Sequence, residues 1–208
     1  MADEKQKVLA KVEKDGSALA DLDDKWKSDK EIVLAAVKQN GQSLKCADKK
    51  LKGDKEFILK AVKQNGFALQ YADKKLKADK KIVLAAVKRD GRSLKCADKK
   101  LKGDKEIVLA AIKQSGFALQ YADPSLKKDK EVVLTAIKNN GWALGYADKK
   151  LKGDKEIVLA AVKQDGGVLK EEVNKKLKGD KEIVLAAIKQ MQSGDALFYA
   201  DKKLKSDK

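Results

Sequence analysis

The stretch DKEIVLAAIKQSGFALQYADPSLKK, residues 104–128, holds six apolar residues in a row between charged ones, and nearly the same stretch returns along the whole chain. Its glycine marks the repetition. The aligned glycines follow one another every 25 residues, and Gly194 closes the series after three extra residues: Gly16, Gly41, Gly66, Gly91, Gly116, Gly141 and Gly166. A fixed period of this length is typical of a solenoid, in which similar units stack on their neighbours.

Each unit is predicted to contain three helical pieces. It opens with an aspartate in an N-cap position, and its first helix, of about eleven residues, ends with a lysine before the glycine. A shorter apolar piece such as FALQYA follows as a second helix. Pro124, directly after Asp123, then indicates a capped helical turn. The capping aspartates are Asp29, Asp54, Asp79, Asp104, Asp129, Asp154 and Asp180.

The apolar run of the first helix, residues 32–37, points all round the helix axis. We therefore expect this helix to be covered on several sides, by its own unit and by the units before and after it. A buried strand is the alternative for an Ile-Val run, but the aspartate cap and the Lys-Gln-Asn-Gly ending favour a helix. One unit has too few large apolar side chains to offset the entropy of ordering its backbone. The sequence predicts an all-α fold, a right-handed α-solenoid of eight 25-residue units.

The two ends of the array differ from its middle. We expect residues 1–208 to form a single solenoid domain: 1–28 as a degenerate N-terminal capping repeat, 29–179 as six complete repeats, and 180–208 as a last repeat with an insertion. Lys7 and Lys11 replace apolar residues in the first unit, and Trp26 takes the slot of Leu51. The chain stops at the opening of a ninth unit, residues 206–208. An uncapped C-terminal repeat would make a homotypic or partner contact, or the array would be a fragment.

Composition narrows the class of partner and the compartment. The chain has 48 Lys and Arg against 32 Asp and Glu, a net charge of +16 that attracts nucleic acid, anionic lipid or an acidic protein face. Cys46 and Cys96 occupy equivalent slots two repeats apart, which argues against a disulfide scaffold and favours a reducing compartment. We expect an intracellular, cytoplasmic protein. An organelle, reached with a transit peptide that has since been removed, is the alternative. No apolar run exceeds six residues, so no membrane span is expected.

Two units carry a family resemblance. DKEIVLAAVKQNGQSLKCADKKLKG, residues 29–53, and DKEVVLTAIKNNGWALGYADKKLKG, residues 129–153, resemble a family of tandem helical repeats catalogued as a domain of unknown function, numbered forty-one sixteen. The resemblance runs from about Glu4 to the end and implies helical repeats but no defined activity. Residues 167–174, GVLKEEVN, lose the Tyr-Ala-Asp signature, and Met191 and Gln192 lie in an insertion.

The residues that usually carry catalysis or bind metal are missing or periodic. There is no histidine, and the two cysteines have no partner at metal-ligand spacing. The carboxylates recur at one register as caps, whereas a catalytic pair needs a unique cleft. Glu171 and Glu172 lie outside this register and are interpreted as an insertion loop. We expect a protein that is not an enzyme and has no cofactor or metal.

One position varies between units: the residue after each glycine. It is Ser17, Gln42, Phe67, Arg92, Phe117, Trp142, Gly167 or Asp195, a range that excludes deep core. An aromatic residue there comes with a tyrosine four residues on, a spacing that brings two side chains together on a helix. We predict a partner-facing ridge, since aromatics are favoured hot spots, with packing between adjacent short helices as the alternative. The candidates are Phe67, Tyr71, Arg92, Phe117, Tyr121, Trp142 and Tyr146.

Paired lysines form a second periodic set, which we call the lysine ladder. Stacked helices would repeat these lysine pairs about every 8–10 Å. Phosphates lie about 3.4 Å apart along a nucleic-acid strand, so the two spacings match only loosely. The sequence predicts a non-enzymatic binding or scaffold module that presents a repeated basic and aromatic ridge to an acidic partner, a protein rather than nucleic acid. Nonspecific nucleic-acid binding and a merely solvated charged face are the alternatives. The ladder is Lys49, Lys50, Lys74, Lys75, Lys99, Lys100, Lys149 and Lys150, with Lys202 and Lys203.

Overall fold

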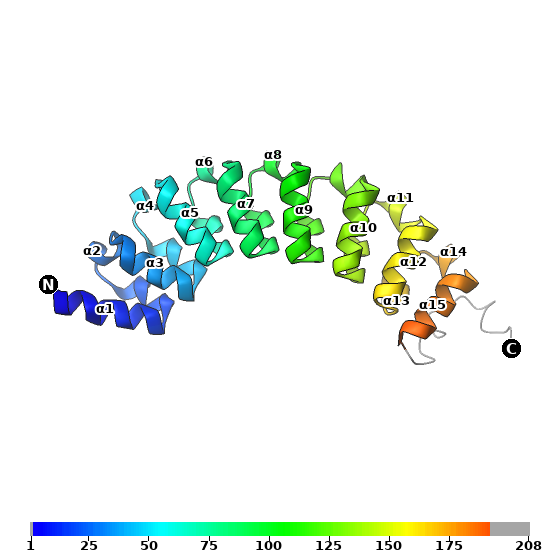
Figure 1. The fold of residues 1–208 in the computed structure, drawn as a ribbon, viewed down its shortest axis with the longest axis horizontal. Helices are drawn as coiled ribbons and strands as arrows, with labels where there is room; N and C mark the ends of the chain where they lie inside the picture. The colour runs from blue at the N-terminus through cyan, green and yellow to red at the C-terminus, as the bar shows by residue number, and fades with distance from the viewer. Residues whose placement is uncertain (1, 192–208) are drawn as a thin grey trace. The chain divides into compact units, whose positions relative to one another are not determined.

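A computed structural model describes residues 2–191, and every regular element in that range is helical. The all-α prediction is confirmed, and the alternative of a buried strand is wrong. Long α-helices recur along the chain, beginning every 25 residues from Lys30 to Lys155 (Figure 1). They are α1 (Ala2–Lys14), α3 (Lys30–Gln39), α5 (Lys55–Gln64), α7 (Lys80–Arg89), α9 (Lys105–Gln114), α10 (Lys130–Asn139), α12 (Lys155–Gln164) and α15 (Lys181–Met191).

Two shorter elements follow most long helices. The first is a six-residue 3-10 helix: η1 (Gly16–Asp21), η2 (Gly41–Cys46), η3 (Gly66–Tyr71), η4 (Gly91–Cys96), η5 (Gly116–Tyr121) and η7 (Gly141–Tyr146). The second is a single turn: α2 (Asp24–Lys27), α4 (Lys49–Gly53), α6 (Lys74–Lys77), α8 (Lys99–Lys102), η6 (Leu126–Lys128), α11 (Lys149–Lys152) and α14 (Lys175–Lys178). Where the sequence departs from the pattern, an α-helical turn, α13 (Val168–Glu171), replaces the 3-10 helix.

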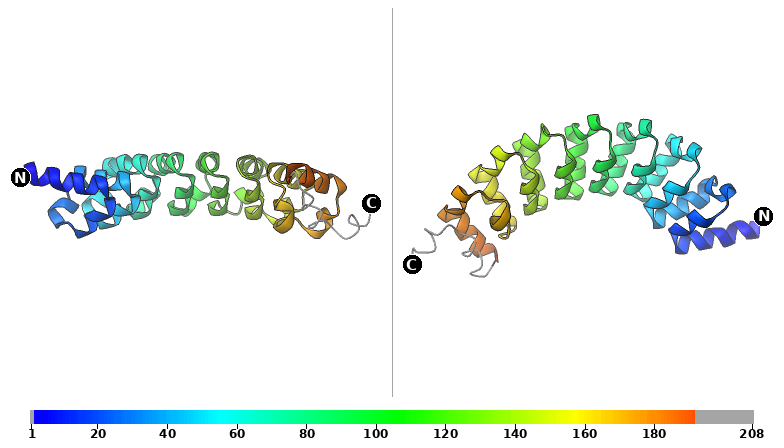
Figure 2. Two further views of the ribbon diagram at one scale, coloured as in Figure 1. Left: turned by 90° about the horizontal axis from the view of Figure 1, so that it is seen from below. Right: turned by 180° about the vertical axis from the view of Figure 1, so that it is seen from behind.

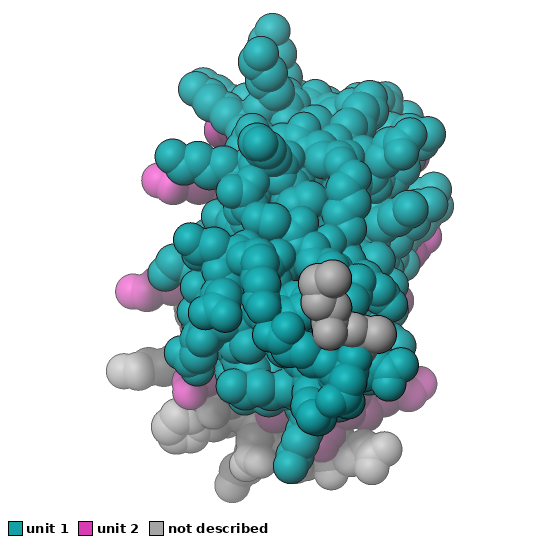
Figure 3. Space-filling view, turned by 90° about the vertical axis from the view of Figure 1, so that its left-hand side faces the viewer, with its two compact units in different colours: residues 1–114 teal, residues 115–208 magenta. Residues whose placement is uncertain are grey.

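The helices group into two compact units, Met1–Gln114 and Ser115–Lys208 (Figure 3). Within the first unit, α3, α5, α7 and α9 lie side by side in one layer. The 3-10 helices η2, η3 and η4 pack against one another in a second layer, and the short turns α4, α6 and α8 follow one edge (Figures 1 and 2). In the second unit α10 and α12 pack against each other and against η7.

The predicted aspartate caps are present at the starts of the long helices. The Oδ1 atom of Asp29 accepts hydrogen bonds from the backbone N–H groups of Glu31 and Ile32, at 2.9 and 3.1 Å. Such a bond satisfies a donor that has no partner within the helix. At the other end Asn40 closes α3, and its side-chain oxygen accepts from the N–H of Gln42 at the start of η2. One residue therefore ends the long helix and begins the next element.

The repeated glycine has a different role from the helix cap expected. Gly116 and Gly141 are the first residues of η5 and η7, and neither has the positive φ of a left-handed cap. A β-carbon on Gly116 would lie 2.6 Å from the carbonyl oxygen of Ala136 in the following long helix, and one on Gly141 would lie 2.7 Å from that of Ala161. Glycine is needed because backbone meets backbone there.

The six-residue apolar run is buried on one side only. In α3, Ile32, Val33, Ala36 and Val37 are fully buried, as expected from contacts with neighbouring elements. Leu34, by contrast, is only half-buried. The same division recurs in α5, α7, α9, α10 and α12, whose equivalent leucines are also half-buried: Leu59, Leu84, Leu109, Leu134 and Leu159.

Candidate binding surfaces

The variable position lies at the surface, as its composition indicated. Phe117 and Tyr146 are exposed, at 37% and 36%, and Arg92 is exposed as well. The remaining ridge candidates, Phe67, Tyr71, Tyr121 and Trp142, are half-buried. The ridge residues are therefore accessible in part, and their contacts decide how much of each is free.

The aromatic pairs do not form within one unit as predicted. A 3-10 helix has three residues per turn, so residues four apart lie on different faces. The ring contact is instead between Phe117 in η5 and Tyr146 in η7, with centroids 6.1 Å apart and planes at 81°. This edge-to-face geometry is the one aromatic pairs prefer. The aromatic residues connect one repeat to the next.

Two other ridge candidates also make contacts between repeats. The Arg92 guanidinium lies 4.9 Å from the centre of the Phe67 ring and forms an ion pair with Asp90 at 2.9 Å. Burial of the Asp90 carboxylate raises its pKa, but the hydrogen bonds from Arg92 outweigh this effect and hold the pKa below its usual value. The Trp142 indole N–H donates to Asp165 at 2.7 Å. These contacts agree with the alternative of local packing for Arg92 and Trp142.

The lysine ladder is exposed at every described position. None of its eight members within residues 2–191 forms an ion pair with another described residue: Lys49, Lys50, Lys74, Lys75, Lys99, Lys100, Lys149 and Lys150. Lys202, Lys203 and Asp195 lie outside the described residues. The ladder thus keeps its positive charge available along the edge formed by the short turns.

A different lysine, the first residue of most long helices, is used for stacking. Its Nζ reaches the capping aspartate of the next long helix: Lys55–Asp79 at 2.6 Å and Lys80–Asp104 at 2.8 Å in the first unit, and Lys155–Asp180 at 2.8 Å in the second. These hydrogen bonds lower the pKa of all three aspartates. We call this set the stacking ion pairs. Sequence reasoning missed it, although Asp-Lys opens every complete unit.

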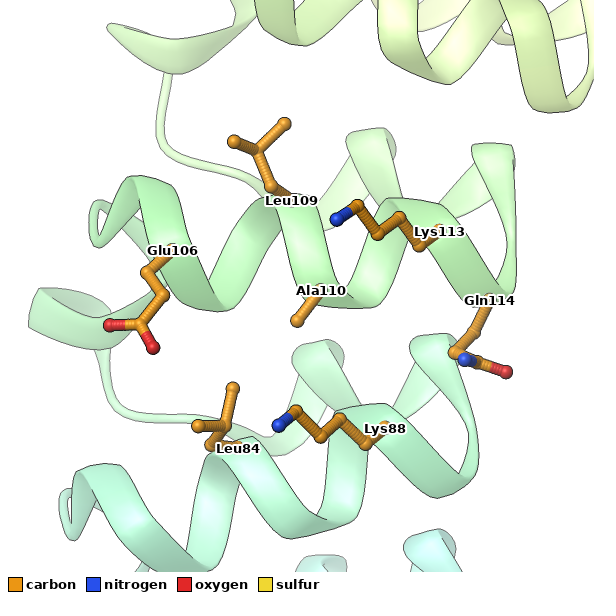
Figure 4. A pocket seen from close by; sticks show the side chains of 7 residues that line it. All are labelled: Leu84, Lys88, Glu106, Leu109, Ala110, Lys113 and Gln114. Carbon is orange, nitrogen blue, oxygen red and sulfur yellow. The ribbon is translucent and has the colours of Figure 1, made fainter.

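The long-helix face of the first unit contains open grooves that the sequence analysis also missed. Figure 4 shows the groove between α7 and α9, where Ala110 lies centrally, Glu106 at one end and Gln114 at the other. Leu84 and Leu109 contribute apolar surface there. A second groove lies between α3 and α5. The sequence did contain an indication of this second groove, because Lys60 stands where other long helices have alanine or threonine.

The remaining candidates behave as structural residues. Cys46 and Cys96 are free and half-buried, and burial raises the pKa of the Cys96 thiol. The insertion-loop interpretation of Glu171 and Glu172 is wrong, because Glu171 ends the helix α13 and Glu172 is its C-cap. Glu172 forms an ion pair with Lys152 at 3.0 Å. Across residues 2–191 no cluster of cysteine and carboxylate groups could hold a metal ion. No helix in that range combines the length and apolarity that crossing a bilayer requires.

Comparison with known proteins gives one match. The family described as "Domain of unknown function (DUF4116)" matches residues 5–52, 54–102, 104–152 and 154–205. Each match spans about twice the spacing of the long helices, so the family's repeat takes in two long helices with their following elements. No curated protein and no solved structure matches the chain.

Proposed function

Because the chain belongs to the family described as Domain of unknown function (DUF4116), whose description names no activity, we propose a function from its surface. The protein is a non-enzymatic binding or scaffold module for an acidic macromolecular partner, a protein in preference to nucleic acid. It presents the lysine ladder and the exposed aromatic residues to that partner. The chain's net charge of +16 supports a partner of opposite sign.

The observation that carries this proposal is that one set of lysines forms ion pairs within the protein and another set does not. Those that begin the long helices form ion pairs with the capping aspartates, such as Lys55 with Asp79. The ladder lysines, such as Lys99 and Lys100, are exposed and make no ion pair within residues 2–191. Unpaired charge on a regular edge raises the rate of encounter with an acidic partner and favours it over basic ones.

The aromatic part of the ridge supports a protein partner. Phe117 and Tyr146, from neighbouring repeats, are exposed and contact each other, and Tyr and Phe are enriched in protein interfaces. The half-buried Phe67, Tyr71, Tyr121 and Trp142 extend the same surface, with Arg92 beside Phe67.

We also propose that residues 1–208 form one right-handed α-solenoid of eight 25-residue units. The regular 25-residue spacing of the long helices and their side-by-side packing in the first unit support this. The boundary between the compact units falls inside one repeat, between α9 and η5. Residues 192–208, on which the expected homotypic contact of the C-terminal repeat falls, lie outside the described residues. The free thiols support an intracellular, cytoplasmic location, with an organelle as the alternative.

Salt dependence tests the proposal against nonspecific nucleic-acid binding. Binding of labelled poly-glutamate and of a single-stranded oligonucleotide would be titrated over a range of salt. Oligonucleotide binding through five or six phosphates should weaken with a log-log slope of about −0.7 per phosphate. We expect poly-glutamate to bind at physiological salt and the oligonucleotide to be lost first.

Two sets of variants separate the ladder from a merely solvated face. Changing Lys49, Lys50, Lys99 and Lys100 to Gln should weaken poly-glutamate binding by about tenfold or more. A native partner captured after nuclease treatment should also be lost with F117A/Y146A. Unchanged affinity in the ladder variant, or capture that requires nucleic acid, would contradict the proposed function.

A further inference from the structure

A groove on the long-helix face of the first unit gathers positive charge from three helices. It encloses about 530 Å³ and is lined by Leu34, Lys38, Lys60, Lys63, Gln64 and Arg89. A second hollow of about 390 Å³ shares Lys38, Gln64 and Arg89 with it. That hollow continues past Gly66 to Phe67 and Asp90. The two hollows form one continuous groove whose lining includes the apolar side chains of Leu34 and Phe67, and we call it the basic groove.

Three of the four cations of the basic groove have no ion-pair partner within residues 2–191. No ion pair joins Lys38, Lys60 or Lys63 to another residue within 2–191. Arg89 donates from Nε to the backbone oxygen of Gln64 at 3.1 Å, a bond to a neutral acceptor. The one carboxylate on the lining, Asp90, is held by Arg92 through both oxygens. Bringing these like charges together is unfavourable until an anion binds among them.

The repeat does not require this concentration of charge. The groove of Figure 4, two repeats further on, has Leu84, Lys88, Lys113 and Gln114 in the equivalent places. There Ala110 replaces Lys60, and the carboxylate of Glu106 lies on the lining. The helix dipole favours cations near the end of a helix and so accounts for Lys63 and Arg89. It does not account for Lys60, which lies in the middle of α5 and is exposed.

We infer that the basic groove is the docking site for an acidic peptide segment of a partner protein. The inference rests on the proposed function and adds to the lysine ladder and the aromatic residues a separate contact for the same partner. Carboxylates of the segment face Lys38, Lys60, Lys63 and Arg89, and apolar side chains flanking them rest on Leu34 and Phe67. Charge complementarity selects the acidic residues. The apolar side chains on the lining select a peptide over a small anion.

The test uses the full chain and a labelled peptide in which leucines flank a run of glutamates. The variant K60A/R89Q installs residues that the chain itself uses at these positions, Ala85 and Gln64 among them, so the fold should be kept. We expect its affinity to fall by about tenfold or more, since two close charge contacts are lost. The matched control K45Q/K95Q removes the same charge from two exposed lysines outside the basic groove and the lysine ladder, and installs the glutamine of Gln70 and Gln120. It should change affinity by about twofold or less.

The outcomes separate this inference from the proposed function. Equal losses in the two variants, or no loss in K60A/R89Q, would overturn docking in the basic groove while acidic binding stands. Failure of the unaltered chain to bind the peptide or poly-glutamate, even at low salt, would overturn the proposed function itself. A gain-of-function variant gives independent support: A110K should add a second binding equivalent per chain, and an unchanged stoichiometry would count against the groove.

Discussion

Two equivalent serines in the first unit differ in whether their hydroxyl groups find a partner. Ser43 Oγ donates to the backbone oxygen of Gly16 at 2.7 Å, and both groups are buried. Ser93, two repeats later, is fully buried, and its Oγ has no hydrogen-bond partner among the described residues. Other units have alanine at this position, as in Ala68 and Ala118.

Alanine should therefore have opposite effects at the two serines. S43A leaves a buried carbonyl oxygen without its donor and should lower the free energy of unfolding by about 1 kcal/mol. S93A removes an unsatisfied hydroxyl and should raise it by about 1 kcal/mol. Urea denaturation of both variants measures the difference. Equal destabilisation by the two substitutions would show that the Ser93 hydroxyl has a partner in solution.

Gly141 has no room for a side chain because the backbone of α12 lies against it. G141A should destabilise the protein by about 1–3 kcal/mol, the usual effect of overpacking. Gly153 offers a matched control, because Ala78 fills the equivalent slot and a β-carbon there would meet its nearest neighbour at 3.4 Å. G153A should stabilise by roughly 0.4–1 kcal/mol through the unfolded state. Thermal unfolding of G141A and G153A tests this. A G141A variant as stable as the unaltered protein would contradict the close approach of the two backbones.

At the scale of the element, the stacking ion pairs make the fold sensitive to acid. The hydrogen bond from Lys55 lowers the pKa of Asp79, so this carboxylate stabilises the folded state at neutral pH. A lowered folded-state pKa means that the contribution is present above the ordinary aspartate value of about 3.9 and is lost as pH falls below it. The melting temperature should decline steeply below about pH 4.

Substitutions at Asp79 separate charge from capping. D79N keeps a side-chain oxygen for the cap, so it should lose little stability at neutral pH and show a shallower acid decline. D79A removes the cap as well and should cost about 1 kcal/mol. Asp73 is a control, since its side chain makes no cap hydrogen bond. Melting curves from acid to neutral pH test this, and an unchanged acid slope in D79N would rule out the ion pair as its cause.

The sequence allowed the long helices to be predicted but not the geometry of the segment after each glycine. Aspartate caps and the apolar run determine helices such as α3 locally. FALQYA has six residues, too few for periodicity to separate an α-helix from a 3-10 helix, so the pairing of Phe117 with Tyr121 was wrong. The ring of Phe117 contacts Tyr146 instead, and this contact depends on how neighbouring repeats stack. The basic groove depends on the same stacking, which brings Lys38 and Arg89 together across α5.

At the scale of the whole molecule, the stability of each repeat should depend mainly on its contacts with the neighbouring repeats. Ile82 in α7 is fully buried and its helix packs against α5 and α9. I82A should cost about 2–5 kcal/mol by leaving a cavity. Hydrogen exchange should then lose protection most in α5, α7 and α9, and least in α1, because each repeat is stabilised by its immediate neighbours. An equal loss throughout the first unit would show that it unfolds as one cooperative block.

Cys46 and Cys96 follow the two serines in units that alternate with those carrying Phe67 and Phe117. From Gly41 to Tyr121 the two kinds of unit alternate, which agrees with a family repeat that spans two long helices, and the unit of Trp142 and Tyr146 ends the alternation. Unequal recombination between gene copies could therefore remove or add one such pair and keep the alternation intact. Loss of a single unit from this stretch would instead place two units of one kind side by side, as Phe117 and Tyr146 already lie. Homologous arrays should accordingly differ in length by even numbers of units.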